Sequence, residues 1–202
     1  MTWKKYLDKI VFVVFLLQIT LIYKLIQIYV PSGSIFKIPF IDDNIPFISV
    51  FVIPYLLYVV VLLLPFVLTF RNKKQFLAVS TAFLFASVMC NIIFVLFPTM
   101  VIRPEVLAIN ILNKSVLFVY TVDGVLNCFP SEHVTFSVLA NLCLLKINKK
   151  LAYYLIPLTI LIIFSTLFIK QHYFPDILGG IVLAFLGYLI FKKVVGMKIS
   201  LR

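Results

Sequence analysis

The chain has 202 residues, of which 63% are hydrophobic and 12% are charged, and 18 Lys and Arg against 7 Asp and Glu give a net charge of +11. A soluble domain is usually about 45–50% apolar and about 25% charged, so this composition excludes a water-facing globule and indicates an integral membrane protein. In such a protein a basic excess is first a topology signal. We therefore expect a single membrane domain over residues 1–202 and no nucleic-acid partner.

Apolar stretches recur along the whole chain. A helix needs about 20 apolar residues to cross a bilayer, and the pattern predicts an all-α fold, a polytopic membrane helix bundle with six transmembrane helices. The first stretch is too long for the apolar region of a signal peptide, and the fourth is the shortest. The predicted spans cover about residues 10–30, 47–70, 76–97, 131–145, 151–169 and 176–195.

The charged residues divide unevenly between the two ends of these spans. One side, with both termini, carries 13 basic residues and the single acid Asp8, whereas the other side carries four basic residues and six acids. Lys24 falls inside the first span, and we assign it no role. Because Lys and Arg concentrate in cytoplasmic loops, we expect a cell-membrane protein with both termini in the cytoplasm. The 13 residues are Lys4, Lys5, Lys9, Arg71, Lys73, Lys74, Lys146, Lys149, Lys150, Lys192, Lys193, Lys198 and Arg202.

The longest connection, residues 98–130, joins the third and fourth spans on the predicted outer side. A loop of this length in a compact domain is usually functional. Its middle, residues 106–112, is apolar, and we expect it to form a helix on the membrane surface.

Three polar clusters lie at the outer ends of the predicted spans. The first contains Arg103, the second contains Ser131 and His133, and the third runs from Ser165 to Asp176. They are far apart in the sequence but share one predicted membrane depth, which favours a single site at the outer face.

This site is expected to bind an anion. Pro130 and Pro175 suit the first turn of the fourth and sixth helices, whose N-terminal ends would attract a phosphate. Arg103 and Lys170 add positive charge, and Ser131 adds a hydroxyl donor. The simplest ligand is a phosphate at the boundary between lipid and water.

The two histidines of the chain carry the predicted chemistry. His172 and Asp176 are four residues apart and therefore share a helical face. A carboxylate on one imidazole nitrogen makes the other more basic, so His172 is a candidate nucleophile toward phosphorus and His133 a candidate general acid or base. Two histidines and few clustered carboxylates do not easily supply a metal site, and Cys90, Cys128 and Cys143 are too scattered for a disulfide or zinc framework. We expect no metal and no cofactor.

These residues resemble the motifs of the type 2 phosphatidic acid phosphatase superfamily, K-x6-R-P, P-S-x-H and S-R-x5-H-x3-D. Arg103-Pro104 matches the end of the first motif, and Pro130-Ser131-Glu132-His133 matches the second. The third is matched by Ser165, His172 and Asp176. The resemblance implies a six-span fold and a phosphohistidine formed on His172. Asp176 would orient His172, and His133 would protonate the leaving group. Arg103, Ser131, Ser165 and Lys170 would bind the substrate.

Two motif cations are missing. Leu96 stands where the first motif begins with Lys, and Thr166 stands where the third has Arg. Lys170 is a candidate replacement. The variant motifs are similar to those of inositol phosphorylceramide synthases and, more distantly, of sphingomyelin synthases, which transfer a phospho-headgroup to an alcohol.

The leading hypothesis is a lipid phosphatase acting on a lipid phosphate or diphosphate, such as undecaprenyl diphosphate, phosphatidate or phosphatidylglycerol phosphate. A phospho-headgroup transferase is the second hypothesis. The third is a non-catalytic transporter of lipids or anions that uses the same pocket. The sequence does not decide the substrate tail or the oligomeric state.

Overall fold

The computed structural model describes residues 6–197. In this part of the chain the regular structure is helical. The β-pairing is limited to isolated bridges, and no β-strand forms there. A π-helical turn, Gln18–Ile22, separates the first two helices, and a 3₁₀ turn, Ser49–Phe51, precedes the fourth. The α-helices are α1 Leu7–Leu17, α2 Tyr23–Tyr29, α3 Pro39–Asp42, α4 Val52–Thr69, α5 Lys73–Leu96, α6 Ile111–Asp123, α7 Glu132–Ile147, α8 Lys149–Phe168 and α9 Phe174–Gly196.

Within residues 6–197, five helical segments are long and apolar enough to cross a membrane, and they match five of the six predicted spans. They are Leu7–Tyr29, Ser49–Thr69, Lys73–Leu96, Lys149–Phe168 and Phe174–Gly196. The fourth predicted span corresponds to α7, which has 16 residues. At 1.5 Å per residue α7 is about 24 Å long, shorter than the roughly 30 Å hydrocarbon core. Its neighbours α4, α5, α8 and α9 surround it, so α7 forms the centre of the bundle.

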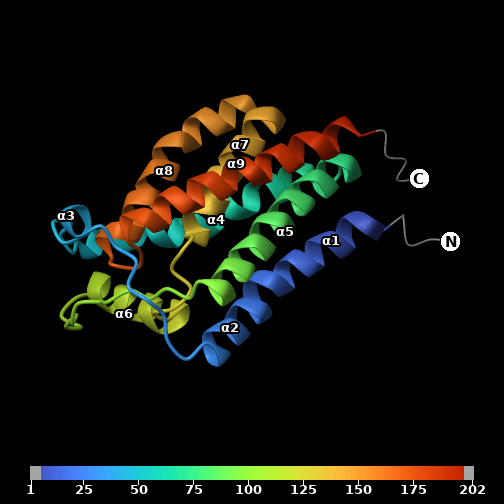
Figure 1. Ribbon diagram of the computed structural model, residues 1–202. Helices are drawn as coiled ribbons and strands as arrows, with labels where there is room; N and C mark the ends of the chain where they lie inside the picture. The colour runs from blue at the N-terminus through green and yellow to red at the C-terminus, as the bar shows by residue number, and fades with distance from the viewer. Residues whose placement is uncertain (1–5, 198–202) are drawn as a thin grey trace.

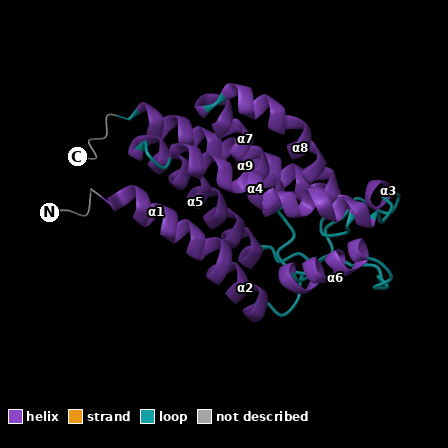
Figure 2. Ribbon diagram, turned by 180° about the vertical axis from the view of Figure 1, so that it is seen from behind, coloured by secondary structure: helices purple, strands orange, loops and turns teal. Residues whose placement is uncertain are grey.

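The long helices run between two ends of the molecule. The start of α1 and the end of α9 lie at one end, whereas α3, α6 and the start of α9 lie at the other (Figure 1). The view from behind shows the loops and α6 gathered at this second end (Figure 2), so the arrangement agrees with the prediction that both terminal helix ends share a side. Four of the basic residues in that prediction, Lys4, Lys5, Lys198 and Arg202, lie outside the described residues.

Aromatic side chains join the helices in the core of the bundle. Phe15 of α1 stacks on Phe66 of α4, with ring centroids 5.5 Å apart. Phe83 of α5 stacks on Phe136 of α7 at 5.7 Å, and Phe15 meets Phe136 edge to face. All four side chains are buried, and offset or edge-to-face pairs of this kind stabilise a core beyond their buried area.

The prediction of a surface helix over residues 106–112 is wrong. These residues have no regular secondary structure up to Ile109, and helix α6 begins at Ile111 and ends at Asp123. Asn110 caps this helix, because its side chain accepts a hydrogen bond from the Asn113 N–H at 2.8 Å. An Asn cap satisfies one of the free N–H groups of the first turn, which explains the later start.

Helix α9 meets the beginning of α7 closely at Gly180. A Cβ atom at this position would lie 2.8 Å from the Ser131 carbonyl oxygen and 2.9 Å from Val134 Cβ. The contact is reinforced at the start of α9, where the Asp176 carbonyl accepts a hydrogen bond from the Ser131 N–H at 3.1 Å. Glycine therefore sets the distance between the two helices that carry His133 and Asp176.

We expect Gly180→Ala to destabilise the protein by about 1–3 kcal/mol, the usual cost of overpacking a filled core. Gly196→Ala is the matched control on the same helix, because a Cβ there would meet no atom within 4 Å. Thermal unfolding in detergent measures both variants. Equal melting temperatures for the two would contradict the close-packing role of Gly180.

Candidate active site

His172 and Asp176 form a buried pair at the start of α9. His172 Nδ1 lies 3.2 Å from Asp176 Oδ2, and the same oxygen accepts a hydrogen bond from the Tyr173 N–H at 2.9 Å. Asp176 is 0% exposed and His172 is 8% exposed. A carboxylate at Nδ1 fixes the tautomer that keeps the proton there, so Nε2 is the basic nitrogen.

The turn after α8 holds His172 in place. Lys170 adopts a positive φ of 56°, the left-handed conformation with which helices commonly end. The Thr166 carbonyl then accepts hydrogen bonds from the N–H groups of Gln171 at 2.9 Å and His172 at 3.1 Å. Thr166, at the position of a missing motif cation, therefore contributes its backbone, while its side chain is fully buried.

His133 comes from the first turn of α7 and faces His172. Their ring centroids are 6.0 Å apart, so the structure brings the two predicted catalytic imidazoles together. The ring of Tyr55 stacks on His133 at 4.4 Å, and the ring of Tyr58 lies at the same distance on a tilted plane. Both tyrosines belong to α4, which thus holds the imidazole from one side.

A cavity of about 330 Å³ opens beside the imidazoles. Its polar end is lined by His133, His172, Asp123, Asn127 and Glu132. Its apolar end is lined by residues of α4 and of the π-helical segment, Val59, Leu62, Leu63 and Ile19. The polar end adjoins a narrow pocket whose lining also includes Tyr55, Cys128 and Gln171.

Arg103 reaches the same region from the extended segment before α6. Its Nη2 donates a hydrogen bond to Gln171 Oε1, and its Nη1 donates to the Tyr120 carbonyl at 2.9 Å. The guanidinium also lies over the Tyr120 ring, 4.3 Å from the centroid. Burial lowers the pKa of Arg103, but a guanidinium stays charged in proteins, so the charge lies next to Gln171.

Two buried donors in this network have no hydrogen-bond partner among the described residues. They are Arg103 Nε and Gln171 Nε2. A buried N–H without a partner costs about 1–3 kcal/mol, so the pair is suited to an incoming anion. Gln171 directly precedes His172, which places these donors beside the predicted nucleophile.

The structure puts Lys170 in a different environment. Its ammonium donates to the Ile45 carbonyl and lies 3.5 Å from the Asp42 carbonyl oxygen, and burial lowers its pKa while Asp42 opposes this effect. Neither Lys170 nor Arg103 is among the residues that line the cavity, but Arg103 contacts Gln171, which lines the narrow pocket. Phosphate binding by Lys170 stays a prediction, and its own contacts favour a role in holding the first outer loop. Leu96 is 78% exposed at the end of α5.

The two predicted serine contacts also have local partners. The Ser165 hydroxyl donates to the Ile162 carbonyl at 2.6 Å within α8. The Ser131 hydroxyl caps α7, accepting a hydrogen bond from the Val134 N–H at 3.4 Å. Both residues are 0% exposed, and phosphate binding by either one stays a prediction.

The two helix N-termini differ from the sequence expectation. Pro130 lies before the cap residue Ser131, outside α7, whereas Pro175 lies in the first turn of α9. At α9 the Phe174 N–H donates to Asp42 Oδ1 at 2.7 Å, and Asp176 takes the Tyr173 N–H. Two carboxylates therefore occupy this helix end, whereas at the α7 end the Ser131 hydroxyl takes the Val134 N–H and Glu132 lies in the first turn.

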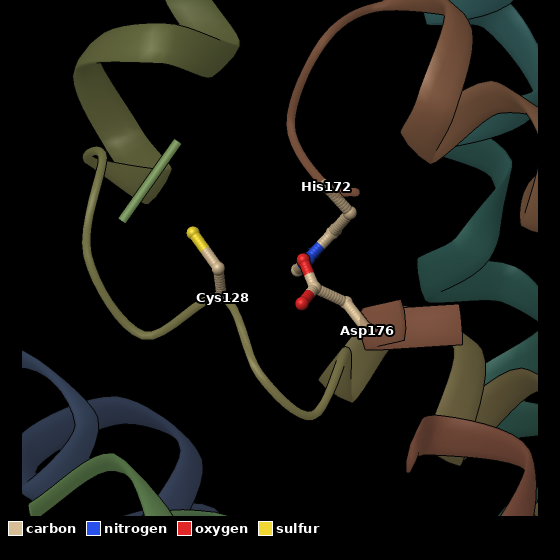
Figure 3. A group of neighbouring side chains, drawn as sticks. All are labelled: Cys128, His172 and Asp176. Carbon is tan, nitrogen blue, oxygen red and sulfur yellow. The ribbon is translucent and has the colours of Figure 1, made fainter. Parts of the chain in front are cut away.

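Cys128 lies opposite the His172–Asp176 pair on the segment between α6 and α7 (Figure 3). One ligand atom from each of these three buried residues lies within 4.8 Å of the others, which raises the question of a metal. Burial raises the pKa of the Cys128 thiol, and the Asp176 carboxylate adds to this effect. A thiol must lose its proton to bind a metal, and His172 Nδ1 is already engaged, so the set fits a metal poorly.

Sequence reasoning missed several lining residues, among them Tyr55, Asp123 and Gln171. Asp123 was counted among the six outer acids, and its place in the long functional connection was the available signal. Tyr55 lies in a span, where an aromatic residue carries no distinguishing pattern. Gln171 occupies a variable position of the third motif.

The sequence model of the PAP2 superfamily matches residues 35–190. This stretch contains all three polar clusters and every helix from α3 through α8, with most of α9. The chain matches no curated protein sequence and no solved structure.

Proposed function

The chain belongs to the PAP2 superfamily, the type 2 phosphatidic acid phosphatases that its motifs predicted, and from that membership we propose a membrane phosphatase that hydrolyses a lipid phosphate or diphosphate. The single observation that carries the proposal is the facing pair of imidazoles, 6.0 Å apart, with a carboxylate on the nucleophile and unpartnered donors beside it. This is the set of groups that phosphoryl transfer through a histidine needs.

The first chemical step forms a phosphohistidine. The lone pair of His172 Nε2 attacks phosphorus while the bond from phosphorus to the lipid oxygen breaks, and a proton from His133 passes to that oxygen. In the second step His133 takes a proton from water, the water oxygen bonds to phosphorus, and the P–N bond breaks. Inorganic phosphate and neutral His172 are the result, and Asp176 stabilises the positive imidazole ring between the steps.

The phosphoryl oxygens are proposed to lie on Arg103 Nε, Gln171 Nε2 and the N-terminal end of α7. Donors aimed at oxygens that gain charge in the transition state usually supply the largest share of catalysis. Arg103 is preorganised for this, because Tyr120 and Gln171 fix its plane.

The lipid tail is proposed to enter from the bilayer. The apolar end of the cavity lies between the π-helical segment and α4, and its residues Val59 and Leu63 are 51% and 41% exposed on the lipid-facing surface. An alkyl chain can therefore stay in hydrocarbon while its phosphate reaches the imidazoles. The basic residues near both termini support a position of this site at the extracytoplasmic face of the cell membrane.

The proposal is tested by phosphate release from purified protein in detergent, with phosphatidate, a lipid diphosphate and a prenyl diphosphate as substrates. We expect release from at least one of them and inhibition by vanadate. An absence of vanadate-sensitive turnover over this panel would favour the non-catalytic transporter instead.

A phospho-headgroup transferase is the second candidate, and one observation favours it. Two carboxylates, Asp123 and Glu132, line the polar end of the cavity together with Asn127, and such groups accept hydrogen bonds from hydroxyls. An acceptor alcohol could therefore take the place of water. Headgroup transfer to a lipid alcohol, with little phosphate release in its absence, would identify this activity.

We expect chelators to leave phosphate release unchanged. His172 Nδ1 already contacts Asp176, and a neutral Cys128 thiol is a poor metal ligand. Dialysis against EDTA, followed by the phosphate assay with and without added Zn²⁺, measures this. Cys128→Ala is the companion variant and should retain most of the turnover. Loss of activity in both experiments, restored by metal in the first, would establish a metal site.

A further inference from the structure

The geometry points to Asp123 as a positioning residue for His133, so that each catalytic imidazole has its own carboxylate. This inference rests on the proposed function. Asp123 Oδ2 lies 4.0 Å from His133 Nε2, and it accepts a hydrogen bond from the Tyr55 hydroxyl at 2.5 Å. None of the three family motifs contains Asp123 or Tyr55.

Asp123 is held from several directions. It is the last residue of α6, and its carbonyl accepts hydrogen bonds from the Tyr23 hydroxyl at 3.3 Å and from the Gln27 amide. Lys24 donates to the neighbouring Val122 carbonyl, a favourable place for a cation because helix C-termini carry partial negative charge. Residues of α2 thus fix the end of α6, which gives Lys24 a structural role that the sequence did not indicate.

The residue after Asp123 is a glycine, and the backbone conformation at the end of α6 requires it. Gly124 has a φ of 69°, and a Cβ there would lie 2.8 Å from Gln27 Nε2. Glycine is the residue that adopts such a conformation without strain. The chain turns sharply after Asp123, and the carboxylate is left facing the imidazole.

Tyr55 links Asp123 to His133 in a second way. Its ring stacks on the imidazole at 4.4 Å, while its hydroxyl orients the carboxylate toward Nε2. Tyr55 is 3% exposed, so neither contact competes with bulk water. The side chains of His133 and Asp123 are 17% and 26% exposed, which leaves them open to the cavity.

The consequence is a division of roles between the two nitrogens of His133. Asp123 stabilises the imidazolium through Nε2, as a carboxylate does in a catalytic triad, and Nδ1 gives its proton to the leaving lipid oxygen. After the transfer Nε2 keeps its proton beside Asp123. The 4.0 Å separation is longer than a hydrogen bond, and contacts of this kind tighten when substrate binds.

The test compares two leaving groups. Asp123→Asn keeps the shape and the acceptor for Tyr55 but removes the charge. In single turnovers we expect phosphoenzyme formation from phosphatidate to slow by about 10–100-fold, with a smaller effect on KM. With p-nitrophenyl phosphate, whose leaving group needs no proton, we expect less than about a threefold change, because general acid catalysis no longer contributes.

Asp43→Asn is the matched control, because Asp43 is an outer carboxylate that pairs with Lys37 away from the cavity. Tyr55→Phe is the second variant and should show the same leaving-group selectivity with a smaller loss, while Asp123→Glu should recover part of the rate. An equal loss with both substrates would reduce Asp123 to a packing role, and no loss with either would overturn the inference. Failure of the wild-type protein to release phosphate would instead refute the proposed function.

Discussion

Replacement of His172 by Ala or Asn is expected to abolish turnover, lowering kcat by at least about 10⁴-fold, the scale on which loss of a covalent nucleophile is measured in other enzymes. Among the described residues, His172 is the one imidazole at the site whose Nδ1 contacts a buried carboxylate, which leaves Nε2 as the basic nitrogen. The Asn side chain is similar in size to the part of the imidazole ring nearest the backbone, and it can form hydrogen bonds. It cannot attack phosphorus. Phosphate release in single and multiple turnovers measures the loss.

The intermediate gives this prediction an independent readout. Wild-type protein mixed with radiolabelled substrate and quenched in alkali should carry a label that is stable to base and lost in acid, as a phosphohistidine is. His172→Asn should carry none, while retaining the elution volume and melting temperature of the wild type. Asp176→Asn should retain a slow reaction, with kcat lowered by about 10²–10⁴-fold. Full turnover in either His172 variant would remove this residue from the mechanism.

The sequence predicted the parts of the fold that depend on local patterns. Long apolar stretches placed five helices to within a few residues, because spanning a bilayer needs continuous hydrophobicity. The fourth predicted span, residues 131–145, also coincides with a helix, α7, but this helix is too short to meet the length criterion for crossing a membrane. The prediction of a helix over residues 106–112 failed, since apolar residues alone do not say where a helix begins. The cap residue Asn110 marks where this helix begins.

The candidate site, like the fold, contains some contacts that local sequence patterns predict and others that they do not. The four-residue spacing of His172 and Asp176 predicted their contact, which the structure has at 3.2 Å. Contacts between distant elements have no such signature. Lys170 is predicted as a phosphate ligand because it is close to His172 in the chain, and its contacts could not be foreseen, since the left-handed turn that presents His172 directs Lys170 to the first outer loop.

Arg103 is a residue that a motif predicts although its contacts are not predictable from the sequence. The motif identified it, while its partners Tyr120 and Gln171 come from α6 and from the turn after α8. With the motif cations absent at Leu96 and Thr166, the amide of Gln171 supplies a donor that a sequence pattern of charges cannot reveal. The proposed phosphate site therefore contains one cation and neutral donors.

Substitution of Arg103 should consequently have a large effect. We expect Arg103→Ala to lower kcat/KM by about 10²–10³-fold, the usual cost of losing one donor to a developing oxyanion. Arg103→Lys should lose nearly as much, because an ammonium cannot bond Gln171, the Tyr120 carbonyl and a phosphoryl oxygen in the fixed plane of a guanidinium. The measurement is kcat/KM for phosphate release, together with the inhibition constant of vanadate.

Vanadate distinguishes binding from folding in this experiment. If Arg103 and Gln171 hold the phosphoryl oxygens, both Arg103→Ala and Gln171→Leu weaken inhibition by vanadate, even when assayed well below their melting temperatures. Lys114→Ala is the matched control, since Lys114 is an exposed cation of α6 on the same side of the molecule, and it should leave inhibition unchanged. Unaltered vanadate inhibition in Arg103→Ala would show that the guanidinium supports the loops around Tyr120, and the anion would then have to be held by the end of α7 alone.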